Sequence, residues 1–294
     1  MRTKNIFIAL ALMVVAVVLS ATEASAAPEG PQSVLTYTAP AKIKLDKETF
    51  DCKIASHKFD KAMGVGTVTF NGRITTIGDN AFEDCSSLTS ITIPDSVTSI
   101  GNNAFFGCTG ELIINCNIPE GSYYGRYRGV FSGSKFTKVT IGKGVTSIGY
   151  NAFRGCSSLT SITIPDSVTT IGYGAFAGCS SLTNITIPDS VTTIGDDAFS
   201  GCTGELIINC NIPDASDYQG VFSDSKFIKV TIGEGVTSIG TFAFDGCSRL
   251  MSITIPDSVT SIGDNAFRGC SSLTNITIPD NVTTIGDHAF RDCI

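Results

Sequence analysis

The chain repeats itself about every 23 residues, and this periodicity constrains the fold more than any other feature. The phenylalanine of an Ala-Phe or Val-Phe pair recurs at intervals of 22 to 26 residues. Its positions are Phe82, Phe105, Phe131, Phe153, Phe176, Phe199, Phe222, Phe244, Phe267 and Phe290. A fixed period of this length is typical of solenoids, in which each unit buries its apolar side chains only against its neighbours. We therefore expect about ten stacked coils that share one continuous core.

A single unit shows how such a coil can be built. Residues 159–181 have the sequence LTSITIPDSVTTIGYGAFAGCSS. Ile162 and Ile164 lie on one face of a short strand because side chains alternate along a strand. Pro165 ends this strand, and a second short inward-facing segment follows it. The Ala-Phe pair is expected to form a single helical or 3₁₀ turn, with Phe176 filling the centre of the coil.

The motif LxxIxIPxxVxxIGxxAFxxC covers residues 67–293. It resembles the BspA-like class of leucine-rich repeats, found in exported and surface proteins. The resemblance implies a right-handed, curved, β-rich solenoid that acts as an adhesin or surface-interaction protein, and it supplies no catalytic residue. A parallel β-helix is the alternative fold, but a turn built around Ala-Phe fits a leucine-rich repeat better.

The N-terminal region does not share the repeat. Arg2 and Lys4 precede an apolar run and a small-residue stretch, so residues 1–26 are predicted to be a secretory signal peptide. Residues 27–66 are predicted to form a cap on the solenoid of residues 67–294, with strands in VLTYT and KIKLDKETFDCKI. These features predict a secreted or cell-surface protein. At the other end, the last coil has no obvious cap and is a candidate surface for self-association.

Charge and hydropathy exclude some partners. The net charge is −7 and no basic stripe is present, which argues against nucleic acid and anionic membranes. The apolar run of residues 6–19 is shorter than the roughly 20 residues that span a bilayer, so no membrane insertion of the mature chain is expected.

The eleven cysteines follow the repeat and have no metal-binding spacing. Eight of them close a unit, where stacking would give neighbouring side chains roughly parallel directions that pair poorly as disulfides. We therefore expect buried free thiols, no metal site and no cofactor.

No catalytic constellation is apparent. The aspartates that follow the repeat proline recur in every regular coil and are explained by the turn that they occupy. His57 and His288 are the only histidines and are expected to lie far apart. A catalytic site needs a particular set of groups at one place, so the chain is predicted not to be an enzyme.

Two surface features are the candidate binding sites. Exposed threonines, among them Thr140, Thr163 and Thr186, should align in a column on a concave strand face, although threonine also simply suits an exposed strand. The sequence GCTGELIINCNIP occurs at 107–119 and again at 201–213, and both copies lead into an irregular coil.

The first copy is followed by an insertion rich in tyrosine and arginine, the residue types that most often anchor interfaces. The candidate contact residues there are Tyr123, Tyr124, Arg126, Tyr127 and Arg128. We expect an extracellular protein or glycan as the partner. A self-assembling structural protein is the alternative, and a carbohydrate-active enzyme on a β-helix is a third possibility that lacks an isolated carboxylate cluster.

Overall fold

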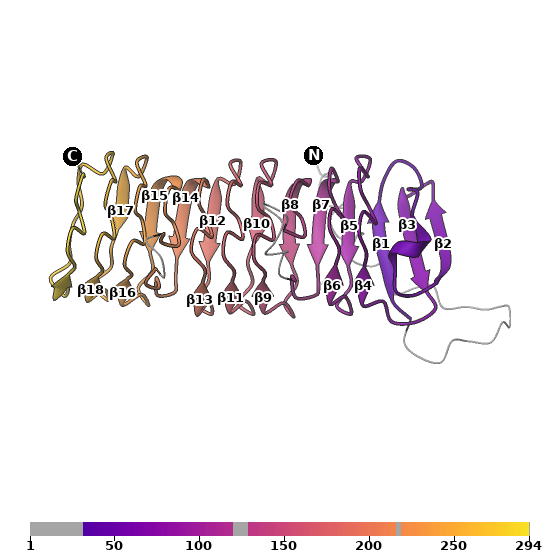
Figure 1. The fold of residues 1–294 in the computed structure, drawn as a ribbon, viewed down its shortest axis with the longest axis horizontal. Helices are drawn as coiled ribbons and strands as arrows, with labels where there is room; N and C mark the ends of the chain where they lie inside the picture. The colour runs from indigo at the N-terminus through magenta and orange to yellow at the C-terminus, as the bar shows by residue number, and fades with distance from the viewer. Residues whose placement is uncertain (1–31, 120–128, 216–218, 294) are drawn as a thin grey trace, which may run out of the picture.

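The chain forms one elongated stack of coils. A computed structural model describes residues 32–119, 129–215 and 219–293. The stack has about nine turns, with the N-terminal strands at one end and the last coil at the other (Figure 1). The predicted repeat solenoid is confirmed: it is a β-solenoid with the 23-residue spacing and almost no helix.

The first row of strands follows the LxxIxI part of each unit (Figure 1). These long strands are β5 (Ser90–Ile93), β7 (Thr109–Ile114), β8 (Lys135–Ile141), β10 (Ser161–Thr163), β12 (Asn184–Ile187), β14 (Thr203–Ile208), β15 (Lys226–Ile232) and β17 (Ser252–Thr254). They pair in parallel, in the orders β5-β7-β8-β10 and β12-β14-β15-β17. We call their outward side the long-strand face.

The second row consists of two-residue strands on another side of the coils. These short strands are β4 (Thr76–Ile77), β6 (Ser99–Ile100), β9 (Ser147–Ile148), β11 (Thr170–Ile171), β13 (Thr193–Ile194), β16 (Ser238–Ile239), β18 (Ser261–Ile262) and β19 (Thr284–Ile285). They form three separate parallel sheets, β4-β6, β9-β11-β13 and β16-β18-β19. We call their outward side the short-strand face.

The core follows the repeat as predicted. Ile162, Ile164 and Phe176 are buried. The ten repeat phenylalanines stack along the axis, with ring centroids of consecutive coils between 5.0 and 5.4 Å apart. Each ring therefore forms part of a continuous apolar column.

The Ala-Phe segment forms a run of hydrogen-bonded turns. Arg154 N donates to the carbonyl of Asn151 and Cys156 N to that of Phe153. Both bonds join residues three apart, as in the single 3₁₀ turn predicted here. Asn151 adopts a positive φ of 53°, so the turns do not continue into a helix. The aspartate turns agree with prediction: in the example unit, Val168 N bonds the carbonyl of Pro165.

All eleven cysteines are free thiols, and eight of them are buried, whereas Cys52, Cys85 and Cys293 are half-buried. The closing cysteine of a coil donates its thiol hydrogen to the phenylalanine carbonyl of the preceding coil. Cys179 Sγ lies 3.1 Å from Phe153 O, and Cys202 Sγ lies 3.2 Å from Phe176 O. The cysteine thus links neighbouring coils without a disulfide.

The N-terminal strands cover the first coil. They are β1 (Val34–Thr38), β2 (Ile54–Asp60) and β3 (Val65–Phe70), and η1 (Lys47–Thr49) is a short 3₁₀ helix. Strand β1 pairs antiparallel with β5 and extends its sheet. VLTYT forms the expected strand, whereas KIKLDKETFDCKI contains η1 and only the first residue of β2. Strand β3 also runs past residue 66, the predicted boundary.

Candidate functional site

The threonine column lies on the long-strand face and is divided in two. Thr140 and Thr163 face each other across β8 and β10. Thr186 belongs to β12, which lies beside β10 but begins the second long-strand sheet. Thr163 and Thr186 are exposed, and Thr140 is half-buried. The column is further interrupted by isoleucines, one of them Ile207 beside Thr186 in β14.

The short-strand face offers a more distinctive feature, because its ladder of hydrogen bonds is interrupted twice. In regular coils the glycine after the short strand donates its N–H to the preceding coil, as Gly172 does to the carbonyl of Ile148 over 2.8 Å. Pro119 and Pro213 occupy this position in the two irregular coils. Proline has no backbone N–H. Each irregular coil is therefore unable to make this bond to the coil before it.

The irregular coils remain bonded to the coils that follow them. Ile118 pairs with Ile148, and Ile212 with Ile239, as isolated parallel bridges. Among the described residues, neither isoleucine pairs with the short strand of the preceding coil. The gaps therefore lie on one side of each irregular coil, after β6 and after β13.

An asparagine side chain takes over the role of a backbone carbonyl in each irregular coil. In regular coils, Thr169 donates both its N–H and its hydroxyl to the carbonyl of Thr146, over 2.9 and 3.2 Å. After the irregular coil, Thr237 of the following coil donates the same two groups to Oδ1 of Asn211, over 2.7 and 3.1 Å. Asn117 accepts the equivalent pair from Thr146 over 2.7 and 3.2 Å.

These bonds orient the asparagine amides. With Oδ1 bonded to the following coil, Nδ2 is left on the other side of each side chain. Among the described residues, neither Nδ2 donates a hydrogen bond, and both asparagines are exposed. Within the described part of the chain, each irregular coil therefore presents an oriented amide donor at the surface that bonds to no other described residue.

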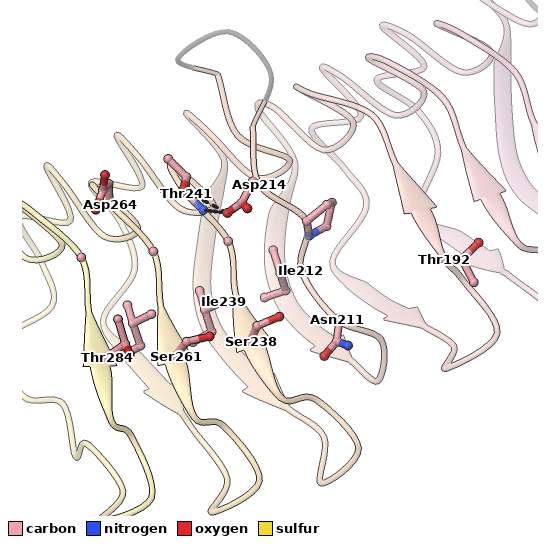
Figure 2. A pocket seen from close by; sticks show the side chains of 15 residues that line it. Thr192, Asn211, Ile212, Asp214, Ser238, Ile239, Thr241, Ser261, Asp264 and Thr284 are labelled. Carbon is pink, nitrogen blue, oxygen red and sulfur yellow. Dashed lines mark hydrogen bonds between the residues drawn. The ribbon is translucent and has the colours of Figure 1, made fainter.

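A groove lies at each interruption. Groove 1 has a volume of about 410 Å³ and is lined by Asp95, Val97, Thr98, Asn117, Ile118, Pro119 and Ser147. Groove 2 has a volume of about 400 Å³, and its lining includes Thr192, Asn211, Ile212, Pro213, Asp214 and Ser238. Figure 2 shows Thr192 on one side of the Asn211 coil, with Ser238, Ser261 and Thr284 on successive strands on the other.

The two grooves are copies of one arrangement. Thr98, Asn117, Ile118 and Pro119 correspond to Thr192, Asn211, Ile212 and Pro213 with the 94-residue offset of the longer repeat, and Ser147 corresponds to Ser238. This shared lining carries no charge. It combines hydroxyl and amide groups with the apolar surfaces of isoleucine and proline.

The carboxylates near groove 2 have structural partners. Oδ1 of Asp214 accepts the N–H and hydroxyl of Thr241 over 2.8 and 2.9 Å, as Figure 2 shows. Oδ1 of Asp264 accepts the N–H of Asp287 over 2.8 Å. Nearby, burial raises the pKa of the Asp197 carboxyl, which accepts a hydrogen bond of 3.4 Å from the Tyr173 hydroxyl. These contacts connect neighbouring coils and assemble no catalytic pair.

The threonines of the predicted column lie on the long-strand face and do not line the grooves. The other predicted contact residues, Tyr123, Tyr124, Arg126, Tyr127 and Arg128, lie outside the described residues.

The remaining ionisable groups are dispersed. His57 contacts the Tyr37 hydroxyl over 2.8 Å in the N-terminal cap, whereas His288 is exposed in the last coil. Within the described segments, no group of three or more His, Cys, Asp or Glu could hold a metal ion. No helix in the same segments is both long and apolar enough to cross a membrane.

The grooves were not predicted, although the sequence carries their signal. Both NCNIP segments, Asn115–Pro119 and Asn209–Pro213, place a proline where regular coils have the glycine that follows Ile. The 94-residue repeat marked these coils as irregular. Only the stacked coils show that the proline leaves a gap toward the preceding coil. They also show that the asparagine two residues before it bonds to the following coil.

Comparison with known proteins gives a family. No curated protein matches the chain in sequence. A leucine-rich-repeat protein from Bacteroides ovatus is 28% identical, with 75% of this chain and 80% of that chain covered and a TM-score of 0.31. A leucine-rich cell surface protein from Faecalibacterium prausnitzii is 27% identical, with 75% of each chain covered and a TM-score of 0.31. The T. pallidum leucine-rich-repeat protein is 21% identical, with 85% and 89% covered and a TM-score of 0.45.

The family model named BspA type leucine rich repeat region matches residues 52–124, 125–220 and 218–294, with six copies. These matches span nearly all of the chain that follows the first cap strand. The protein therefore belongs to the family of BspA-type leucine-rich-repeat proteins.

Proposed function

We propose that this protein is an exported or surface-exposed binding protein that recognises an extracellular protein or glycan and performs no catalysis. The observation that carries the proposal is the pair of equivalent grooves on the short-strand face, with volumes of about 410 and 400 Å³. A stack that presents the same set of hydroxyl, amide and apolar side chains twice is suited to recognition. Family membership supports the same role.

The chemistry of the described residues also favours binding over catalysis. The raised thiol pKa values belong mainly to buried cysteines that link coils, such as Cys156, where burial raises the pKa to about 11. A thiolate nucleophile needs the opposite, a lowered pKa and access to substrate. A lowered pKa occurs at the half-buried Cys85, where the cause is a hydrogen bond with Cys108, another thiol of the stack. Groove carboxylates such as Asp214 already hold backbone N–H groups.

The test is binding of the chain from Ala27 onward to an array of glycans and extracellular-matrix proteins. We expect saturable binding to at least one class, and no turnover of any bound polysaccharide. Absence of binding to every probe would overturn the proposed function.

Two regions are then compared by substitution. One variant replaces Tyr123, Tyr124, Arg126, Tyr127 and Arg128 by serine, and another replaces Thr140, Thr163 and Thr186 by alanine. Loss of binding in one variant assigns the contact to that region. Self-association through the last coil stays a prediction, and sedimentation at increasing protein concentration tests it.

A further inference from the structure

We infer that the two grooves are halves of one extended site for a linear, neutral polysaccharide, which lies along the short-strand face and contacts both grooves at once. This inference rests on the proposed binding function and specifies its ligand.

The grooves are in line and a short distance apart. In the short-strand row, Ile118 is followed by Ile148, Ile171, Ile194 and then Ile212, so the irregular coils are four coils apart. At about 4.8 Å per coil, the grooves are separated by roughly 19 Å. A polymer can span this distance, whereas a monosaccharide cannot.

The shared lining suits an uncharged, hydroxyl-rich ligand. Each groove offers the free Nδ2 donor of Asn117 or Asn211 and the hydroxyl of Ser147 or Ser238. A sugar hydroxyl is both donor and acceptor, so it can satisfy both kinds of group.

Backbone carbonyls add acceptors at the same place. The carbonyls of Thr169 and Ile171 accept N–H groups of the next coil, from Thr192 and Gly195. Among the described residues, the irregular coil donates no such backbone bond to the carbonyls of Thr192 and Ile194. A ligand hydroxyl in groove 2 would find acceptors there.

Two exposed tyrosines lie on the coils between the grooves. Tyr150 and Tyr173 follow the glycine of their coils and are 41% and 40% exposed. They occupy the position held by Thr241 and Asp264, which line groove 2.

The ring of Tyr150 lies close to the stack surface. It extends over the next coil, since a Cβ added to Gly172 would be 2.6 Å from its Cδ1, and Asp264 extends over Gly286 in the same way. Tyr173 reaches the next coil with its hydroxyl, which lies 3.4 Å from Oδ2 of Asp197. A chain running from groove 1 to groove 2 would pass over these two coils.

Aromatic rings offer flat apolar surfaces with a polar edge, which match the C–H face and hydroxyls of a sugar. The path thus has two polar grooves with apolar floors at its ends. Between them it crosses the coils of Tyr150 and Tyr173 and then that of Asp196, which occupies the same position on the third coil. Among the described residues, the charged groups that line the grooves are carboxylates, Asp95 in groove 1 and Asp214 and Asp264 in groove 2, which disfavour an anionic polysaccharide.

The probes are dextran, mannan and β-glucan, each as the polymer and as oligosaccharides of increasing length. Calorimetry measures the affinity and the stoichiometry of each. Asn117→Asp and Asn211→Asp keep the Oδ1 acceptor of the coil while replacing the free donor by a carboxylate oxygen. We expect each single variant to weaken binding of a bound polymer by about 10²-fold, because the second contact is intramolecular. The double variant should bind at least tenfold more weakly than either single variant.

The length of the oligosaccharide and the position of the substituted residue give two further, independent tests. Oligosaccharides too short to span the grooves should bind two per chain and more weakly than the polymer, which should bind one per chain. Tyr150→Ser with Tyr173→Ser should weaken the polymer more than the shortest oligosaccharides. The control Ser252→Ala, at an exposed residue of β17 outside the threonine column, should change neither the polymer affinity nor the oligosaccharide affinity.

The inference is overturned if the double asparagine variant binds the polymer like the unchanged protein, or if none of the three probes binds. Binding to a matrix protein without any of these polysaccharides would leave the proposed binding function intact and remove the glycan site. Circular dichroism of each variant must match the unchanged protein, so that a folding defect is not counted as a loss of contact.

Discussion

The rings of Phe153 and Phe176 lie parallel, with an interplanar angle of 1° and centroids 5.4 Å apart. The ring of Phe199 stacks on the other side of Phe176 at 5.3 Å. Phe176 is therefore enclosed along the axis as well as within its own coil. This arrangement makes the phenylalanine column the continuous part of the core, because each ring contributes apolar contact to two neighbouring coils.

Replacement of Phe176 by alanine should lower the free energy of unfolding by about 3–5 kcal/mol, since a fully buried aromatic is lost and a cavity remains. Urea denaturation measures this change. Phe290 is only partly buried and has a described ring on one side, so Phe290→Ala is the matched variant and should cost less. Equal losses would show that stacking on both sides does not add to stability.

The buried thiols predict a loss of stability at alkaline pH. Burial raises the pKa of Cys156 to about 11 and that of Cys202 to about 12, from an ordinary value of 9.0. Above pH 9 the unfolded chain releases these protons first, so the contribution is fully present below pH 9 and is lost as the pH rises through 11 to 12.

Each such thiol contributes a slope of at most about 1.4 kcal/mol per pH unit in that window. The free energy of unfolding from urea titrations at pH 8 to 11 should fall less steeply in a Cys156→Ala, Cys202→Ala variant. The same slope in both proteins would assign the alkaline loss to other groups, such as the tyrosines.

Replacement of Asn265 by glycine should destabilise the fold less than replacement by alanine. Its φ is 53°, in the left-handed region, where a residue with Cβ other than Asn or Asp costs about 1–2 kcal/mol. We therefore expect Asn265→Ala to lower the free energy of unfolding by about 1 kcal/mol, and Asn265→Gly to have a smaller effect. Thermal and urea unfolding compare the two variants, and a larger loss for glycine would contradict the conformational explanation.

Asn211 should contribute to stability through its acceptor oxygen alone. Asn211→Ala leaves the N–H of Thr237 without its 2.7 Å partner, and we expect a loss of about 1–2 kcal/mol. Asn211→Asp keeps an oxygen at that place and should stay within about 0.5 kcal/mol of the unchanged protein near neutral pH. If both variants lose the same stability, the side chain does not replace a carbonyl in the ladder.

Much of the fold could be predicted from individual residues. The spacing of Ile162, Ile164 and Phe176 predicted their burial, because strand alternation and the repeat period are local properties of the chain. The free thiols followed in the same way, since Cys179 recurs at one position of the coil. The single turn at Ala-Phe was predicted as well. Its left-handed residue was not, because that residue can be asparagine, aspartate, glycine or even Phe242.

The sequence by itself therefore determined the coil, its period and its core, because each coil buries the same apolar pattern against the next. Only the tertiary structure decided where neighbouring coils lack a backbone hydrogen bond on the short-strand face. Pro213 leaves a gap because its missing N–H would have bonded to the preceding coil, at the position of Ile194. Asn211 becomes an oriented donor because Thr237 bonds to its Oδ1. These contacts depend on which coils become neighbours, and neighbours are established only when the coils stack.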